Sequence, residues 1–248
     1  LDAGKRVLTE KPMASEVADA QEMIRHAGGR LGVVFQNRYN QASQVIRAAI
    51  ADGRYGKLLA LRAAVNWHRT KEYYVESGWR GRFATEGGGV LINQAIHTLD
   101  LLIYFAGKPA SVRGKVSTDA LYDVIEVEDT AHGLIRFESG LTANFYCTNC
   151  FGIDRPVEIE LVFERATLKT DAETLYETVG QDTRVLVASQ AAGEKAYWGT
   201  SHEALIRDFY RAAEEDRPFW IDGESALPVL KLLKGVYRSS ETGEEIPL

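Results

Sequence analysis

The chain has 248 residues, enough for one to two domains, and its 45% hydrophobic content is sufficient to bury a sizeable core, which excludes disorder as its overall state. Its 29 basic and 35 acidic residues give a net charge of −6, a balance that favours neither nucleic acid nor an anionic membrane surface as a partner. The longest uninterrupted apolar run, Leu101 to Ala106, is far shorter than the ~20 residues that a membrane span requires.

The first fifty residues follow a strand–helix–strand–helix pattern. Short apolar runs at 6–9 and 31–35 predict two buried strands. Ser15 stands at the N-cap position of the helix between them, and Gly28 is placed to end that helix. Apolar residues at helical spacing over 42–50 predict the second helix. This order predicts a parallel βαβ unit.

After Asp52 the pattern changes to an alternation that is typical of strands with one buried face. The predicted strands lie at about 59–67, 111–118, 130–137, 141–148, 157–161, 166–170 and 184–189. An apolar helix is predicted over 90–106, and two late helices close the chain, the first opened by the capping box Thr200-x-x-Glu203. We therefore predict a parallel α/β unit over 1–52, followed over 53–248 by a mostly antiparallel open sheet covered on one face by helices.

Three polar residues interrupt the apolar helix that follows the triple glycine 87–89. Asn93, His97 and Asp100 are spaced by four and three residues, so a regular helix places them on one face. Polar groups on a buried helix must find partners, and an internal hydrogen-bond network is one explanation. We favour the other, in which they line a cleft, where the neutral imidazole of His97 could transfer a proton.

A lysine–proline pair follows the first predicted strand. Lys11 and Pro12 come at the carboxyl end of that strand, the end at which open α/β sheets bind ligands. A lysine at this place could stabilise a developing alkoxide or orient a substrate hydroxyl, and the bond to Pro12 is a candidate for the cis form. The alternative is a surface lysine beside a turn proline.

Aromatic and basic residues gather over 67–82. They include Trp67, Arg69, Tyr73, Tyr74, Trp79, Arg80 and Arg82. Aromatic faces can stack on sugar or nicotinamide rings and arginines can bind phosphate, so a ligand site is one interpretation. The other is a solvated loop with two core tryptophans.

The only two cysteines, Cys147 and Cys150, form a C-x-x-C pattern beside a predicted strand. No second pair completes a zinc site, and the pattern does not open a helix, so we expect structural cysteines, no metal site and a reducing, cytoplasmic location. His26, His132 and His202 are isolated, and we expect them to be ordinary surface or capping residues.

Taken together, these segments resemble the Gfo/Idh/MocA family of glucose-fructose oxidoreductase, inositol dehydrogenase and their relatives. The resemblance follows, in order, Glu10-Lys11-Pro12, Trp79-Arg80-Gly81, Gly87-Gly88-Gly89, His97-Thr98-Leu99-Asp100, Asp208-Phe209, Arg217-Pro218 and Asp222-Gly223. It implies a dehydrogenase that moves a hydride between NAD or NADP and a hydroxyl-bearing carbon of a sugar, sugar derivative or cyclitol. It implies that residues 1–52 are the remnant of a doubly wound parallel sheet that binds the dinucleotide. It also implies a homodimer or homotetramer formed through the open sheet.

The resemblance also assigns roles to individual residues. It places the family's lysine at Lys11 and its proton-transferring histidine at His97. Asn93 stands where family members usually carry an aspartate, and because an amide cannot take a proton, Asn93 should orient the substrate hydroxyl. The expected cofactor contacts are Glu10, Asn37, Trp79 and Arg80, and the expected substrate contacts are Arg38, Tyr74 and Gln94.

One family feature is absent from the sequence. No G-x-G-x-x-G phosphate loop occurs in these residues, so we expect the chain to be a shortened form of a longer enzyme that binds a dinucleotide poorly by itself. Two alternatives remain open: an NAD-assisted glycosidase similar to this family, and a non-catalytic domain that binds sugar or mediates assembly.

Overall fold

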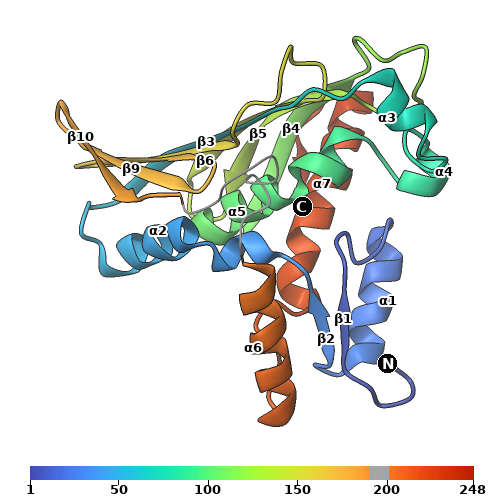
Figure 1. Cartoon of the computed structure of the whole chain (residues 1–248), viewed down its shortest axis with the longest axis horizontal. Coiled ribbons are helices and arrows are strands. Elements are labelled where there is room, and N and C mark those ends of the chain that lie inside the picture. The colour runs from blue at the N-terminus through green and yellow to red at the C-terminus, as the bar shows by residue number, and fades with distance from the viewer. Residues whose placement is uncertain (190–200) are drawn as a thin grey trace.

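A large open sheet dominates the computed structural model, which describes residues 1–189 and 201–248 (Figure 1). Within that range its strands are β3 (Leu58–Asn66), β4 (Pro109–Ser117), β5 (Thr130–Phe137), β6 (Thr142–Thr148), β7 (Glu158–Phe163), β8 (Thr167–Asp171), β9 (Thr174–Val179), β10 (Asp182–Val187) and β11 (Ile246–Pro247). They follow the order β10-β9-β8-β7-β3-β6-β5-β4-β11. Every neighbouring pair is antiparallel except β3 and β6, which confirms the predicted mostly antiparallel sheet.

Helices cover one face of this sheet and leave the other open (Figure 1). The helices are α1 (Val17–Ala27), η1 (Gln36–Tyr39), α2 (Gln41–Asp52), α3 (Lys71–Val75), α4 (Phe83–Glu86), η2 (Leu91–Ala95), α5 (Ile96–Ala106), α6 (His202–Glu214) and α7 (Gly223–Thr242). Alternation in β3 turns Leu61, Ala63 and Val65 toward the helices, where each is at most 5% exposed. The core therefore lies between the covered face and α2, α5 and α7.

The predicted βαβ unit is confirmed. β1 (Val7–Thr9) and β2 (Leu31–Val33) pair in parallel, and α1 connects them. The predicted cap at Ser15 is wrong, because α1 begins one residue later, after Glu16. The Glu16 carboxylate lies 2.6 Å from Nζ of Lys234 on α7, which ties the start of α1 to the neighbouring helix. Gly28 ends α1 with a φ of 51°, as expected.

The apolar helix over 90–106 is present, but its first turn is wider than an α-helix. η2 is a π-helical turn, and α5 continues it from Ile96. The turn before it is tight: a Cβ on Gly89 would lie 1.9 Å from the backbone oxygen of Glu128, so only glycine allows this approach. The π turn contains Asn93, whereas His97 and Asp100 stand three residues apart within the regular helix α5.

The helical stretch Phe83–Ala106 is long and apolar enough to cross a membrane by length and composition alone. However, 83% of the most apolar 18-residue part of this stretch is buried within the fold, as is usual for a core helix.

The sequence did not predict β9, β11, α3, α4 or η1. The capping box predicted at Thr200 lies outside the described residues, and the described part of that helix follows Ser201.

Candidate active site

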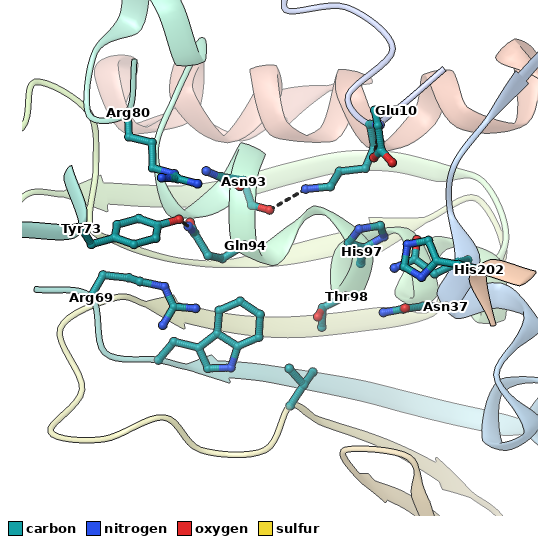
Figure 2. Close-up of a pocket in the computed structure, with 14 residues that line it drawn as sticks. Glu10, Asn37, Arg69, Tyr73, Arg80, Asn93, Gln94, His97, Thr98 and His202 are labelled. Carbon is teal, nitrogen blue, oxygen red and sulfur yellow. Dashed lines mark hydrogen bonds between the residues drawn. The ribbon is translucent and has the colours of Figure 1, made fainter. Parts of the chain in front are cut away.

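A cavity of about 350 Å³ opens where β1, η1, η2 and the end of β3 meet (Figure 2). Its lining comes from five segments that are far apart in the sequence: 10–11, 36–37, 67–80, 93–98 and His202, with Val157 completing the wall. The volume is at the lower end of those typical for small-ligand pockets. Lys11, Asn93 and His97, which the sequence nominated for catalysis, all line it.

Lys11 is held against the start of the long helix. Its Nζ donates to the backbone oxygen of Asn93 at 2.9 Å, and the Lys11–Pro12 peptide is cis. Burial lowers the pKa of Lys11, although the nearby carboxylates of Glu10 and Glu86 oppose that effect. The ammonium group is thus fixed beside the cavity with further N–H donors left for a ligand.

His97 is half-buried in the cavity wall, one turn after Asn93, and its ring meets the edge of Phe35 with centroids 5.7 Å apart. Burial lowers the pKa of His97 well below 6.5, and the positive charge of Lys11 and the neighbouring His202 lower it further. Its Nδ1 has no hydrogen-bond partner in the described part of the chain. The imidazole is therefore neutral at pH 7 and able to accept a proton.

Asn93 is oriented by a carboxylate that the sequence analysis did not single out. Its Nδ2 donates to Oε1 of Glu86 at 2.5 Å, while the other oxygen of Glu86 accepts from the backbone N–H of Gly81 at 2.6 Å. Because the amide nitrogen is engaged by Glu86, the amide oxygen of Asn93 is the group suited to accept a bond from a hydroxyl.

The two ends of the cavity differ in chemistry, as Figure 2 shows. One end carries Arg69, Tyr73, Arg80 and Gln94, and the other carries Glu10, Asn37, His97 and His202. The basic and aromatic stretch nominated from the sequence therefore contributes to a cavity rather than only to a solvated loop.

The end with Glu10 and Asn37 fits the polar edge of a nicotinamide ring. Asn37 Oδ1 is buried and has no partner among the described residues, so it could accept from a carboxamide N–H. Arg80, another expected cofactor contact, lies at the opposite end, and Trp79 does not line the cavity but stands 44% exposed. The four residues expected to contact the cofactor therefore do not form one nicotinamide site.

Two residues expected to contact the substrate, Arg38 and Tyr74, are buried and do not line the cavity. Arg38 is 4% exposed and binds Asp100 through two hydrogen bonds, 2.8 Å from Nε to Oδ2 and 2.6 Å from NH2 to Oδ1. Asp100 therefore partners an internal arginine and does not line the cleft, contrary to the expectation for it. Tyr74 is 4% exposed and its hydroxyl accepts from Asn149 Nδ2 at 2.8 Å.

Tyr74 nevertheless supports the cavity indirectly. Asn149 Nδ2 also donates to Oε1 of Gln94 at 3.2 Å, and Nε2 of Gln94 donates to the hydroxyl of Tyr73 at 3.4 Å. Gln94 and Tyr73 line the cavity, so this chain of bonds fixes the wall from behind.

His202 lines the cavity, although the sequence suggested an ordinary surface or capping residue. It stands at the start of α6 and reaches the site only through the folding of the chain. The two cysteines of the C-x-x-C pattern, Cys147 and Cys150, are both free. Burial raises the pKa of Cys150 to about 11, and Asp129 raises it further. Within residues 1–189 and 201–248, no group of three His, Cys, Asp or Glu side chains could hold a metal ion.

Glu128 is buried directly beneath the triple-glycine turn. Its carboxylate accepts from the backbone N–H of Gly89 at 2.9 Å and of Leu91 at 3.0 Å, and from the hydroxyl of Tyr237 at 2.9 Å. Burial nevertheless raises the pKa of Glu128 from 4.5 to about 7.

The raised pKa of Glu128 predicts a pH dependence of stability. The native carboxyl holds its proton more tightly than the unfolded one, so the free energy of unfolding should fall as pH rises from about 4.5 through 7, by about 3 kcal/mol. Urea unfolding at pH 5 and pH 8 measures this difference, and E128Q should reduce it. E126Q, at an exposed carboxylate paired with Arg82, is the control, and an equal loss of pH dependence in both variants would contradict the assignment.

Comparisons with known proteins agree on one family. Residues 43–169 match the model of the GFO/IDH/MocA C-terminal domain. The chain is 35% identical over 147 residues to 1,5-anhydro-D-fructose reductase of Ensifer adhaerens, which covers 58% of this chain but only 43% of that relative. It is 27% identical to D-glucoside 3-dehydrogenase of Escherichia coli (strain K12) over 100% of this chain and 74% of the relative.

The fold has close counterparts among solved structures. The WlbA dehydrogenase from Bordetella pertussis, in complex with NADH and UDP-GlcNAcA, superposes with a TM-score of 0.82 at 30% identity. The match covers 99% of this chain and 73% of that structure.

Proposed function

The chain belongs to the GFO/IDH/MocA family, and from that premise we propose that the protein is an oxidoreductase that transfers a hydride between NAD(P) and a hydroxyl-bearing carbon of a sugar, sugar derivative or cyclitol. One observation carries the proposal: Lys11, Asn93 and His97 line the same cavity. They supply a cation, a hydroxyl-orienting amide and a neutral base.

In the direction of oxidation, each of the three residues has a distinct task. Asn93 accepts a hydrogen bond from a neighbouring hydroxyl of the substrate and so holds the reacting hydroxyl near His97, which takes the proton of that reacting hydroxyl onto a ring nitrogen. Lys11 stabilises the negative charge that develops on the substrate oxygen as that proton leaves. When bound, NAD(P)⁺ supplies the hydride acceptor. In the direction of reduction, His97 returns the proton to the oxygen.

Glu10 and Asn37 are the groups that would hold the nicotinamide end of the cofactor. Their place at the carboxyl end of β1 and in η1 supports this role, because parallel strands present ligand sites at that end.

We assign residues 1–52 to the nucleotide-binding part of the protein and residues 53–248 to the substrate and sheet part.

The names of the relatives favour redox chemistry over the alternatives. Both relatives and the WlbA structure carry reductase or dehydrogenase names, and that structure contains NADH and a sugar derivative. A glycosidase or a non-catalytic sugar-binding domain is therefore the weaker assignment.

Incubation of the whole protein with NAD⁺ or NADP⁺ and a panel of sugars and cyclitols tests this function. We expect the absorbance of reduced nicotinamide to rise with at least one polyol. Sugar release with no net change in reduced nicotinamide would instead indicate a glycosidase.

The open sheet face supports assembly into a homodimer or homotetramer. Outward-facing residues there include Tyr146 on β6 and Val162 on β7, the two strands that flank β3, and they are 43% and 38% exposed. Burial of such a face against a second copy would remove apolar surface from water. Sedimentation analysis of the whole protein tests the assembly.

The two free cysteines are consistent with a cytoplasmic location.

A further inference from the structure

We infer that Glu86 is a positioning residue for the reaction, whose carboxylate fixes the amide of Asn93 so that only an acceptor, Oδ1, faces the substrate. The inference rests on the proposed function and deepens it, because Glu86 is not among the residues that line the cavity. It makes Glu86 and Asn93 a matched pair, with the charge on the residue behind the cavity wall and the neutral amide on the residue in the wall.

The carboxylate of Glu86 is anchored at one oxygen. Oε2 accepts from the backbone N–H of Gly81 at 2.6 Å. This N–H is itself held in place, because the backbone oxygen of Gly81 accepts from the N–H of Glu126 at 2.7 Å. Gly81 has a φ of 80°, and a Cβ on it would lie 2.7 Å from Cγ2 of Ile125, so its backbone has no room to move aside. The anchored carboxylate is left with Oε1 to meet Asn93.

The second oxygen of Glu86 determines which end of the Asn93 amide faces it. Oε1 accepts from Nδ2 of Asn93 at 2.5 Å. An ionised carboxylate is an acceptor only, so the reversed amide would place two oxygens against each other and lose a charge-assisted bond. The bonding network thus fixes the orientation of the amide, and Nδ2 does not turn toward the substrate.

The backbone of Asn93 is fixed independently of its side chain. Nζ of Lys11 donates to the backbone oxygen of Asn93 at 2.9 Å, the bond that is dashed in Figure 2. The backbone N–H of Asn93 donates to the oxygen of Gly89 at 3.1 Å. Within the described part of the chain, the side-chain Oδ1 accepts no hydrogen bond, and Asn93 lines the cavity. Oδ1 is therefore the group of this residue that is left for a substrate hydroxyl.

The charge of Glu86 also acts on Lys11. Burial raises the pKa of Glu86, and its bonds from Gly81 and Asn93 and the charges of Arg80 and Lys11 oppose that effect. Burial lowers the pKa of Lys11, and the charges of Glu10 and Glu86 oppose it in turn. Glu86 thus helps to keep the Lys11 ammonium charged without placing a carboxylate where the substrate binds.

The test exchanges the amide and the carboxylate. N93D alone sets two carboxylates against each other. In E86Q the introduced amide oxygen must still accept from Gly81, so its N–H group faces Asn93, whose amide turns over and presents Nδ2 to the substrate. The double variant E86Q/N93D restores one donor and one acceptor at the contact, and the second oxygen of the introduced carboxylate faces the cavity as an acceptor.

The activity of the four proteins is measured on the whole enzyme at pH 8, with NAD(P)⁺ and the sugar or cyclitol of the panel that it oxidises fastest. We expect kcat/KM to fall roughly 10- to 100-fold in N93D and to fall in E86Q, since a small misplacement of the reacting hydroxyl is costly. E86Q/N93D should exceed both single variants, so that E86Q is harmful in one background and beneficial in the other. E76Q, which removes an exposed carboxylate, should not rescue N93D. If E86Q lowers kcat/KM in both backgrounds, or if N93D is as active as the wild type, the positioning role is wrong.

Urea unfolding without cofactor or sugar separates this inference from the proposed function. If no compound reduces NAD(P)⁺, the proposed function fails, whereas the coupling between Glu86 and Asn93 is still measured. We expect E86Q to lower the urea midpoint of the wild type and to raise that of N93D. Additive effects of the two substitutions would refute the matched pair, and the same curves show whether a weakly active variant is folded.

Discussion

Replacement of His97 by alanine is expected to lower turnover by roughly 10²- to 10⁴-fold, the usual contribution of a positioned acid–base group. The imidazole is neutral because burial and the charge of Lys11 lower its pKa well below 6.5. Wild-type oxidation should therefore lose activity only at acid pH, where His97 becomes protonated. Steady-state rates between pH 5 and pH 9 measure both effects, and the acid limb should disappear in H97A.

His202 provides the matched control for this experiment. It is also an imidazole that lines the cavity, but it is exposed at the start of α6 and is not expected to carry the proton. H202A should lower turnover far less than H97A and should keep the acid limb. If H97A retains more than about a tenth of wild-type turnover, or if H202A is the more damaging change, the assignment of the base is wrong.

The alternating strands and the position of Lys11 at the end of β1 could be predicted from the sequence for simple physical reasons, whereas the catalytic roles of Lys11 and His97 came from the family resemblance. The strands β6, β7 and β8 alternate between buried and more exposed positions, and that period of two is visible in any one strand. Lys11 was placed at the cavity because the carboxyl end of β1 is the ligand-binding end of a parallel pair. Both arguments depend on local pattern and on general rules of topology.

The errors occurred where the outcome depended on phase or on distant segments. Asp100 was placed in the cleft with His97 by its spacing of three residues, but it binds the buried Arg38, which is distant in the sequence, and does not line the cavity. Tyr74 was expected to contact the substrate but is buried, while the adjacent Tyr73 lines the cavity; α3 has only 5 residues, too few to reveal which side is buried. Nothing in the sequence around His202 indicates that it lines the cavity, because only the tertiary fold brings the start of α6 there.

The pair formed by Arg38 and Asp100 is expected to dominate the response of stability to mutation. Both side chains are almost fully buried, at 5% and 2% exposed, and the arginine also lies within 6 Å of the ring centroids of Phe35, Tyr104 and Trp220. Burial raises the pKa of Asp100, although the charge of Arg38 opposes this. Either partner alone would thus be a buried charge without compensation.

Each single replacement, R38M or D100L, should lower the free energy of unfolding by about 3–5 kcal/mol, as removal of one partner from a buried pair does. The double variant should recover much of that loss, since two apolar side chains of similar volume need no counter-charge. Urea unfolding of the four proteins measures the coupling. If R38M instead keeps wild-type stability and raises the KM of the sugar, Arg38 is the substrate contact that the family resemblance suggested, and its burial against Asp100 does not persist in the working enzyme.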